Sequence, residues 1–273
     1  MPELIIEPGR AETNYWHDLW RYRELFYFLA WRDILVRYKQ TAIGIAWAVV
    51  RPFLTMIIFT ILFSRIAKLH SEGNVPYALL VMAGMLPWQF ISTSLSASSE
   101  SLVSNSNLIS KVYFPRLIVP ASSVITSFVD FLITLALMAL MMLWYRFTPG
   151  FQVLLLPAFM VLAFCCAFGA GLWLSALTVE YRDFRYVIPF IVQFGLYISP
   201  VGFSSSVVPS KWRLLYSLNP AVGAIDGFRW ALLHGQNPIW WPAMVESIVV
   251  TSILCVTGVW YFRKMERTFA DVI

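Results

Sequence analysis

Charged residues are scarce in this sequence. Asp, Glu, Lys and Arg make up 13% of its 273 residues, whereas soluble globular chains carry about 25%. So few ionised groups cannot cover a water-facing surface of this size, which excludes a soluble domain. Apolar residues make up 59% of the chain, and the mean hydropathy is +0.69. These values predict a single domain whose surface faces lipid.

The motifs of common enzyme classes are also missing. The sequence has no Gly-Lys dipeptide, which excludes a Walker A phosphate loop, and no pair of histidines at metal-ligand spacing. It has no Gly-x-Ser-x-Gly nucleophile elbow. The three cysteines, Cys165, Cys166 and Cys255, lie in apolar stretches, and an odd number there fits no disulfide framework. We therefore expect transport rather than catalysis, with no cofactor and no metal bound by this chain.

Long apolar segments are plentiful, and six of them qualify as membrane spans. A helix needs about 20 mostly apolar residues to cross the roughly 30 Å hydrocarbon layer. The segments are residues 43–64, 77–99, 117–145, 153–178, 187–210 and 241–262. Arg51 and Pro52 are expected to break the first segment, and three prolines and Gly202 break the fifth. The sequence thus predicts an all-α membrane protein with six transmembrane helices.

The distribution of basic residues predicts the orientation of these spans. With six crossings, 13 Lys and Arg residues fall on the side of the termini, six fall on the other side, and Arg51 stays inside a span. Lys and Arg are enriched in cytoplasmic loops. Both termini are therefore expected in the cytoplasm, and the net charge of +5 is explained by topology without a nucleic-acid partner. The first 13 residues hold no apolar core of signal-peptide length, so the first span is expected to direct targeting.

Residues 14–36, which precede the first span, predict an amphipathic helix. At helical spacing one face carries Trp16, Leu19, Trp20, Phe26, Leu29 and Ala30. A basic, Trp-rich amphipathic helix beside a span lies naturally in the lipid headgroup region. The pattern does not distinguish a simple anchor from a helix that also braces a partner.

Ionisable residues within the spans are candidates for function. A charge at the membrane centre costs roughly 2.5 to 3.5 kcal/mol on insertion scales. Asp130 lies near the middle of the third span, whereas Glu246 lies near a span end and can reach the interface. Asp130 is expected either to pair with another span or to line a transport path. Arg51 lies either within the first span or at its cytoplasmic end.

Four strings of residues occur in order between residues 30 and 230. They are Arg37–Trp47 followed by Arg51-Pro52, the Gly84–Trp88 turn, Tyr113–Arg116, and the series Ser199-Pro200-Val201, Val208-Pro209, Lys211-Trp212, Leu218-Asn219-Pro220 and Arg229. Each string is weak alone. Together, their order and spacing resemble the membrane subunits of ATP-binding-cassette type-2 exporters that move O-antigen, capsule or teichoic-acid polysaccharides across the bacterial inner membrane.

This resemblance implies a homodimer of six-span subunits with two copies of a separate ATPase subunit bound at the cytoplasmic face. ATP and Mg would be bound by that partner. The resemblance also implies that residues 104–116 form a coupling segment that contacts the ATPase. The coupling residues expected are Lys111, Tyr113, Phe114, Pro115 and Arg116. Without the resemblance, a plain connecting loop would be the preferred interpretation, because proline is common at helix starts.

The resemblance further implies an external hairpin, matched by residues 202–236, whose short helices re-enter the membrane around a closed exit. Backbone at membrane depth must be buried in protein or line a wet cavity, and this segment is too short for two more crossings. The candidates for path or gate residues are Arg51, Trp88, Asp130, Tyr197, Phe203, Trp212 and Tyr216. The alternative is a surface loop in which Trp212, Tyr216 and Trp230 form an interfacial aromatic belt.

These observations favour export of a polyprenyl-linked polysaccharide, with O-antigen the expected cargo, by a multi-pass protein of the bacterial inner membrane in contact with membrane lipids. Two other functions stay open. One is a type-2 permease for a small hydrophobic drug or lipid, although the compact external loops disfavour it. The other is a membrane enzyme acting on polyprenyl lipid, which would need clustered acids or histidines at one membrane face.

Overall fold

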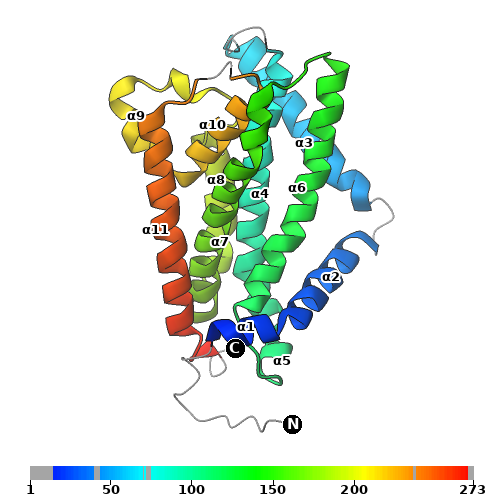
Figure 1. The fold of residues 1–273 in the computed structure, drawn as a ribbon, viewed down its shortest axis with the longest axis vertical. Coiled ribbons are helices and arrows are strands. Elements are labelled where there is room, and N and C mark those ends of the chain that lie inside the picture. Colours follow the sequence, from blue (N-terminus) through cyan, green and yellow to red (C-terminus); the bar gives the residue numbers. More distant parts are fainter. Residues whose placement is uncertain (1–14, 40–43, 70, 72–74, 236–237, 270–273) are drawn as a thin grey trace.

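The computed structural model describes residues 15–39, 44–69, 71, 75–235 and 238–269, and every regular element among them is a helix. Five helices in these ranges are long and apolar enough to cross a membrane. They are α3 (Gly44–Phe59) continued by the π-helix η1 (Thr60–Ile66), α4 (Tyr77–Ser104), α6 (Ile118–Trp144), the 3-10 helix η2 (Phe151–Leu155) with α7 (Leu156–Glu180), and α11 (Trp241–Met265). Figure 1 shows them running roughly along the long axis of the molecule. The all-α prediction is confirmed, as are five of the six predicted spans.

The predicted fifth span corresponds to a shorter helix, α8 (Phe184–Ile198). Its 15 residues extend about 22 Å, which is less than the roughly 30 Å hydrocarbon layer. The chain nevertheless passes along α8 from one end of the bundle towards the other. α7 finishes beside the end of α11, where Tyr261 Oη donates a hydrogen bond to Glu180 at 3.3 Å, and α11 begins at the opposite end (Figure 1). α8 carries the chain back between these two ends.

Helix α4 forms the centre of the bundle. It contacts α3, α6, α7, α8 and α10, and 89% of its most apolar 18-residue window is buried, against 17–39% for the other four long helices. Buried serines such as Ser94 and Ser98 keep its surface narrow, which lets neighbouring helices approach closely. The outer helices therefore leave apolar faces uncovered, which is stable only where lipid or another subunit covers them.

Helices α7 and α11 make a close backbone contact. A Cβ atom at Gly169 would lie 2.6 Å from Cys255 Cα, and one at Gly258 would lie 2.4 Å from the Gly169 carbonyl oxygen. Any side chain at either position would force the two helices apart. Small residues are a common way to pack membrane helices, because lipid offers no hydrophobic drive for their association.

Two of the predicted interruptions are helical in the structure. Helix α3 runs through Pro52 without ending, so the expected break there was wrong. The residues Gly84–Trp88, expected to form a turn, lie inside α4 together with Pro87. Proline lacks an N–H and clashes with the preceding turn, which breaks helices in water. Inside a membrane bundle, neighbouring helices and local backbone adjustments satisfy the freed groups, so the helix continues.

The predicted amphipathic segment 14–36 forms two short helices within its described part. They are α1 (Tyr15–Arg21) and α2 (Arg23–Lys39). Leu29 and Ala30 are buried, and α2 contacts α6. Trp16 and Trp20, by contrast, are 60% and 70% exposed. The body of the protein therefore covers the Leu29 side and leaves these two tryptophans uncovered, and the amphipathic face lying against lipid stays a prediction.

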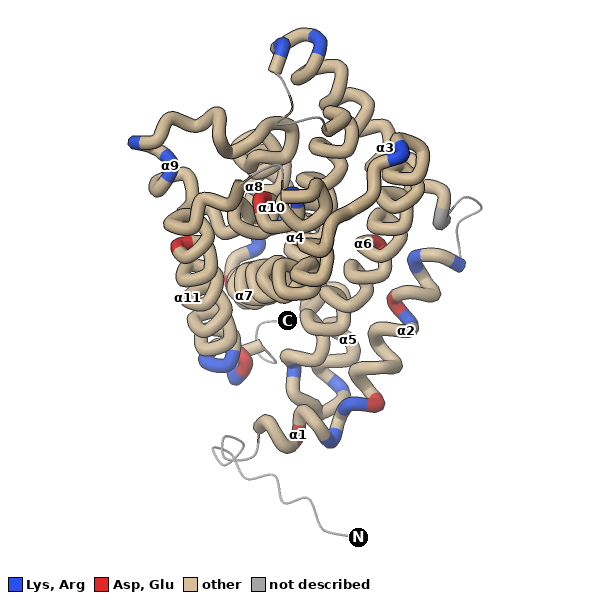
Figure 2. Tube along the Cα trace, turned by 45° about the horizontal axis from the view of Figure 1, so that its top comes forward, with Lys and Arg blue, Asp and Glu red and all other residues tan. Residues whose placement is uncertain are grey.

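The two ends of the bundle differ in structure. One end holds α1, the four-residue helix α5 (Ser106–Ile109) and the end of α11. The other end holds a hairpin of η3 (Ser205–Val207), α9 (Ser210–Ser217) and α10 (Pro220–Leu232). α10 is buried along most of its length and contacts α4, α7 and α11. Figure 2 shows Lys and Arg at α1, α2, α9 and the end of α11, with few charges along the long helices.

Candidate functional site

The loop that follows α5 forms part of the wall of a groove, at the end of the bundle where α1 and α11 meet. The groove has a volume of about 900 Å³, and its walls include Tyr113, Phe114, Pro115 and Arg116. The structure thus brings four of the five predicted coupling residues together. Lys111 is exposed outside this wall. Phe114 is buried, whereas Tyr113 is 52% exposed, so the loop has an anchored side and an open side.

A contact between Arg116 and Glu266 fixes this loop to the end of α11. The backbone N–H of Arg116 donates to Glu266 Oε1 at 2.7 Å, and its guanidinium donates to the Glu266 carbonyl oxygen. Burial raises the pKa of the Glu266 carboxyl, although the hydrogen bond from Arg116 acts in the opposite direction. Nearby, Arg263 Cζ lies 4.6 Å from the Tyr15 ring centroid. α1, the loop and α11 are therefore joined at one place.

A second group of predicted residues borders a cleft between α2, α3, α4 and α6. Arg51 and Asp130 both line this cleft, which has a volume of about 280 Å³. Asp130 forms an ion pair with Arg37, with Nη1 and Oδ2 separated by 2.8 Å, and accepts a hydrogen bond from the Tyr38 hydroxyl. Burial, together with Asp130, raises the pKa of Tyr38. Asp130 therefore pairs with α2 rather than with another span, while still bordering open space.

Arg229 lies at the centre of the opposite end, on α10. Its side chain is fully buried. It donates hydrogen bonds to the carbonyl oxygens of Val201 at 2.8 Å, Phe203 at 2.6 Å and Leu80 at 3.2 Å. A guanidinium carries five N–H donors in a fixed fork and can therefore join several backbone segments at once. Here it ties the segment after α8 to α4 and α10.

Other contacts hold the same segment in place. The Tyr77 hydroxyl donates to the Gly202 carbonyl oxygen at 2.6 Å, and Asn219 Nδ2 donates to Ser199 Oγ at 2.9 Å. The rings of Phe63 and Phe203 have centroids 6.1 Å apart, which joins η1 to the hairpin. The chain between α8 and η3 is thus fixed to three different helices.

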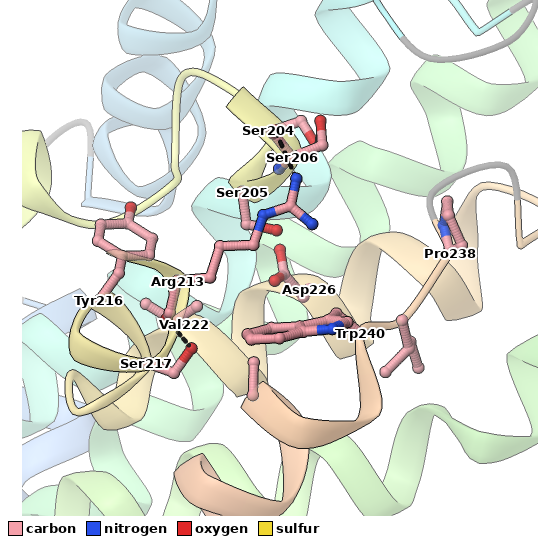
Figure 3. Close-up of a pocket in the computed structure, with 12 residues that line it drawn as sticks. Ser204, Ser205, Ser206, Arg213, Tyr216, Ser217, Val222, Asp226, Pro238 and Trp240 are labelled. Carbon is pink, nitrogen blue, oxygen red and sulfur yellow. Dashed lines mark hydrogen bonds between the residues drawn. The ribbon is translucent and has the colours of Figure 1, made fainter. Parts of the chain in front are cut away.

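The predicted path and gate residues do not gather at a single place. Trp88 lies against α8, since a Cβ atom at Gly195 would lie 2.4 Å from its ring. Tyr197 and Trp212 are 60% and 53% exposed. Tyr216 borders a separate cavity in the hairpin, shown in Figure 3. The structure therefore divides these residues among the cleft near Asp130, helix α8 with its contact to α4, and the hairpin.

The sequence did not identify the structural roles of several residues that hold these sites, although Arg37, Tyr38 and Arg229 lie in the strings that carry the resemblance. Arg37 and Tyr38 pair with Asp130, Glu266 holds the loop, and Arg229 holds the hairpin. For Arg229 there was a usable signal, because it is the one basic residue in the apolar stretch 220–233. For Glu266 there was none, since it meets Arg116 across 150 positions of sequence.

No metal centre accompanies these sites in the described ranges, where no three His, Cys, Asp or Glu side chains come together as a possible metal site.

Residues 24–233 match the family model described as ABC-2 type transporter. The O-antigen export system permease protein RfbA of Myxococcus xanthus is 26% identical over 258 residues, which cover 94% of this chain and 98% of the relative. A protein of the same name from Klebsiella pneumoniae is 25% identical over 243 residues, which cover 89% of this chain and 92% of the relative. The family match spans well over half of the chain, and with its long apolar helices the protein is a multi-pass membrane permease of the ABC-2 type transporter family.

Proposed function

We propose that this protein is the membrane subunit of an ABC exporter that moves a lipid-linked polysaccharide, namely O-antigen, across the bacterial inner membrane. The observation that carries the proposal is the similarity to the RfbA permeases over 89–94% of this chain. The energy comes from ATP, which a separate subunit binds with Mg and hydrolyses. The absence of a Gly-Lys dipeptide, and so of a Walker A loop, supports this division of labour.

The working unit is a homodimer that carries two ATPase subunits, and residues 104–116 transmit their motion. The loop suits this role because Phe114 and the Arg116–Glu266 contact anchor it while Lys111 and Tyr113 stay exposed. A partner can therefore press on the open side without unfolding the loop. Both termini and this loop face the cytoplasm, in agreement with the excess of basic residues there.

Helix α8 serves as the sixth crossing, and the hairpin of α9 and α10 enters the membrane from outside. The buried contacts of Arg229 with Val201 and Phe203 support this arrangement, since backbone at membrane depth must be enclosed by protein. Helices α1 and α2 lie in the headgroup region, with Trp16 and Trp20 towards lipid. Within the dimer, the hairpin closes the exit, and the cleft with Arg51 and Asp130 belongs to the path.

Deletion of the gene provides the direct test of function. We expect the lipid-linked polymer to accumulate at the inner face of the membrane and the surface polysaccharide to disappear, with both effects reversed by the intact gene. The measurements are surface polysaccharide on gels and the lipid-linked polymer in extracts of cells opened after surface digestion. Unchanged surface polysaccharide in the deletion strain would refute the proposal.

The coupling role is tested by changing the exposed side of the loop. Tyr113→Ala combined with Lys111→Glu should lower export by about tenfold, a loss of roughly 1.4 kcal/mol in coupling, while the amount of protein in the membrane stays normal. Arg182→Ala is the matched control, because Arg182 is also exposed at this end of the bundle but follows α7. Normal export by the double variant would leave the loop as a connector only.

A further inference from the structure

The hairpin borders a small cavity, lined by both polar and apolar groups, that neither the coupling loop nor the Asp130 cleft uses. The cavity has a volume of about 180 Å³ and lies between η3, α9, α10 and the start of α11. Its walls include Ser204, Ser206, Arg213, Tyr216, Asp226 and Trp240. Figure 3 shows Asp226 between the Arg213 guanidinium and the indole ring of Trp240. Four separate elements thus contribute polar and aromatic groups to one space.

Arg213 is held rigidly in this wall. Its Nε donates to the Val208 carbonyl oxygen at 2.9 Å and its Nη2 donates to the Ser206 carbonyl oxygen at 2.7 Å. Its Cζ atom lies 5.9 Å from the Trp240 ring centroid. The guanidinium and the indole therefore border the cavity in a fixed relation, which lowers the entropy cost of binding a ligand there.

The charges of the walls favour a neutral ligand. Arg213 carries a positive charge and Asp226 a negative one, and both face the same cavity. A phosphate or another anion would be attracted by the first and repelled by the second. A neutral polyhydroxyl compound can instead donate to the carboxylate and accept from guanidinium or serine groups.

The aromatic wall narrows the class of ligand further. A pyranose ring has a polar hydroxyl edge and a face of C–H groups, and this face lies well against an indole such as Trp240. Ligand sites typically combine aromatic surface with a few fixed polar groups, and those for drug-sized molecules have volumes of about 300–1,000 Å³. A cavity of about 180 Å³ is smaller than this range and suits one sugar ring rather than an oligosaccharide.

We propose that this cavity binds a single neutral sugar unit of the exported polymer at its exit, with Trp240 against the ring face and Asp226 and Arg213 at the hydroxyl edge. This inference rests on the proposed function as a polysaccharide exporter. Because Arg213 also holds the backbone of η3, a bound sugar contacts the same residue that shapes the hairpin.

Saturation-transfer NMR on the purified full-length protein in lipid nanodiscs tests the site. The probes are the methyl glycosides of glucose, galactose, mannose and rhamnose. We expect saturable binding of at least one glycoside, weakened by about tenfold or more in Trp240→Ala, a loss of roughly 1.4 kcal/mol. Trp241→Ala is the matched control, because Trp241 is the next residue, is 67% exposed and does not line the cavity. It should bind like the parent.

Further variants guard against misfolding as the cause of lost binding. Ser205→Trp, which fills the cavity, should abolish binding, while the variant unfolds at the same temperature as the control. The inference is overturned if no glycoside binds saturably, if both tryptophan variants lose affinity equally, or if inorganic phosphate displaces the glycoside. Export and binding fail separately: a deletion strain that still exports refutes the function, whereas lost export with no glycoside binding refutes only the sugar site.

Discussion

Arg229 shows how one side chain can define the structure of a whole segment. The irregular chain between α8 and η3 cannot satisfy all of its backbone hydrogen bonds by itself. Arg229 supplies the missing donors to the carbonyl oxygens of Val201 and Phe203. Gly84 makes room for it, since a Cβ atom there would lie 2.7 Å from Arg229 Nη2. A buried charge is tolerated only when its donors are satisfied, and here carbonyl oxygens provide that satisfaction.

Replacing Arg229 by Met should therefore strongly destabilise the hairpin. The variant keeps an apolar stem but leaves several buried carbonyl oxygens without donors, at a cost of about 1–3 kcal/mol each. Thermal unfolding of the purified protein, followed by size-exclusion chromatography after heating, measures the loss. Lys211→Met is the control, because Lys211 is exposed on the same hairpin and should unfold like the parent. Equal stability of the two variants would contradict the role assigned to Arg229.

Glu266 gives the second residue-scale prediction, a dependence of stability on pH. Burial raises its pKa above 4.5 in the folded protein, so folding favours the protonated carboxyl. This stabilising contribution is present below about pH 4.5 and is lost as the pH rises through the folded pKa. The unfolding temperature of the parent should therefore fall as the pH rises, and in Glu266→Gln this fall should disappear.

The comparison requires unfolding temperatures at a series of pH values from about 4.5 upwards, because the pKa of Glu266 is raised from 4.5. Glu100→Gln serves as the matched control, because Glu100 is exposed near the end of α4 and its replacement should leave the parent profile unchanged. If Glu266→Gln followed the parent profile as well, the buried carboxyl would not be the source of the slope.

Residue types in the sequence indicated the candidate positions better than their partners. Asp130 was identified as a candidate because a carboxylate is costly within a span. Its partner Arg37 lies 93 positions away in the sequence, and nothing in the residues between them indicates that the two side chains meet. The pairing depends on how α2 crosses α6, which is a matter of packing between helices. Local pattern does not encode such a crossing.

At the scale of elements, the segment leading into the hairpin contacts η1. The Phe63 and Phe203 rings meet between them, and bulky apolar groups close a path by excluding water. Phe203→Ala should therefore increase the ion permeability of proteoliposomes in the absence of ATP. Leu215→Ala, at a 60% exposed position of α9, should not. A Phe203→Ala protein as tight as the parent would place the closure elsewhere.

Long helices were predictable from sequence and their irregularities were not. Apolar length located α4, α6, α7 and α11 to within a few residues, because the bilayer fixes the length that a span needs. The internal prolines, Pro52 and Pro87, misled the prediction, since the propensity that ends a helix in water is overridden by surrounding helices. The apolar stretch 220–233 agreed with the burial of α10, but local pattern did not identify α4, α7 and α11 as the helices that cover it.

For the molecule as a whole, the central prediction concerns which end faces the cytoplasm. In a protein whose three cysteines are replaced by Ala, single substitutions Lys111→Cys and Leu215→Cys place thiols at opposite ends of the bundle. A membrane-impermeant maleimide should label the Leu215→Cys protein in intact spheroplasts, and the Lys111→Cys protein only after the membrane is opened. The cysteine-free protein provides the background. Labelling of the Lys111→Cys protein in intact spheroplasts would reverse the orientation.

Helix α11 joins the two ends of the bundle without a break. It is an uninterrupted helix from Trp241 to Met265, about 37 Å long at 1.5 Å per residue. At one end it continues into Glu266, which accepts a hydrogen bond from Arg116 of the loop. At the other end it follows directly on Trp240, which lines the cavity of the hairpin. It packs closely against α7 at Gly169 and Gly258, and side chains hold the two helices together nearby: Trp173 stacks on Tyr261 with ring centroids 4.1 Å apart, and Trp173 Nε1 donates to Thr257 Oγ1 at 3.1 Å. We therefore expect α7 and α11 to move as one body, so that a displacement of the loop at one end of α11 shifts the indole ring at the other end without passing through the central helix α4.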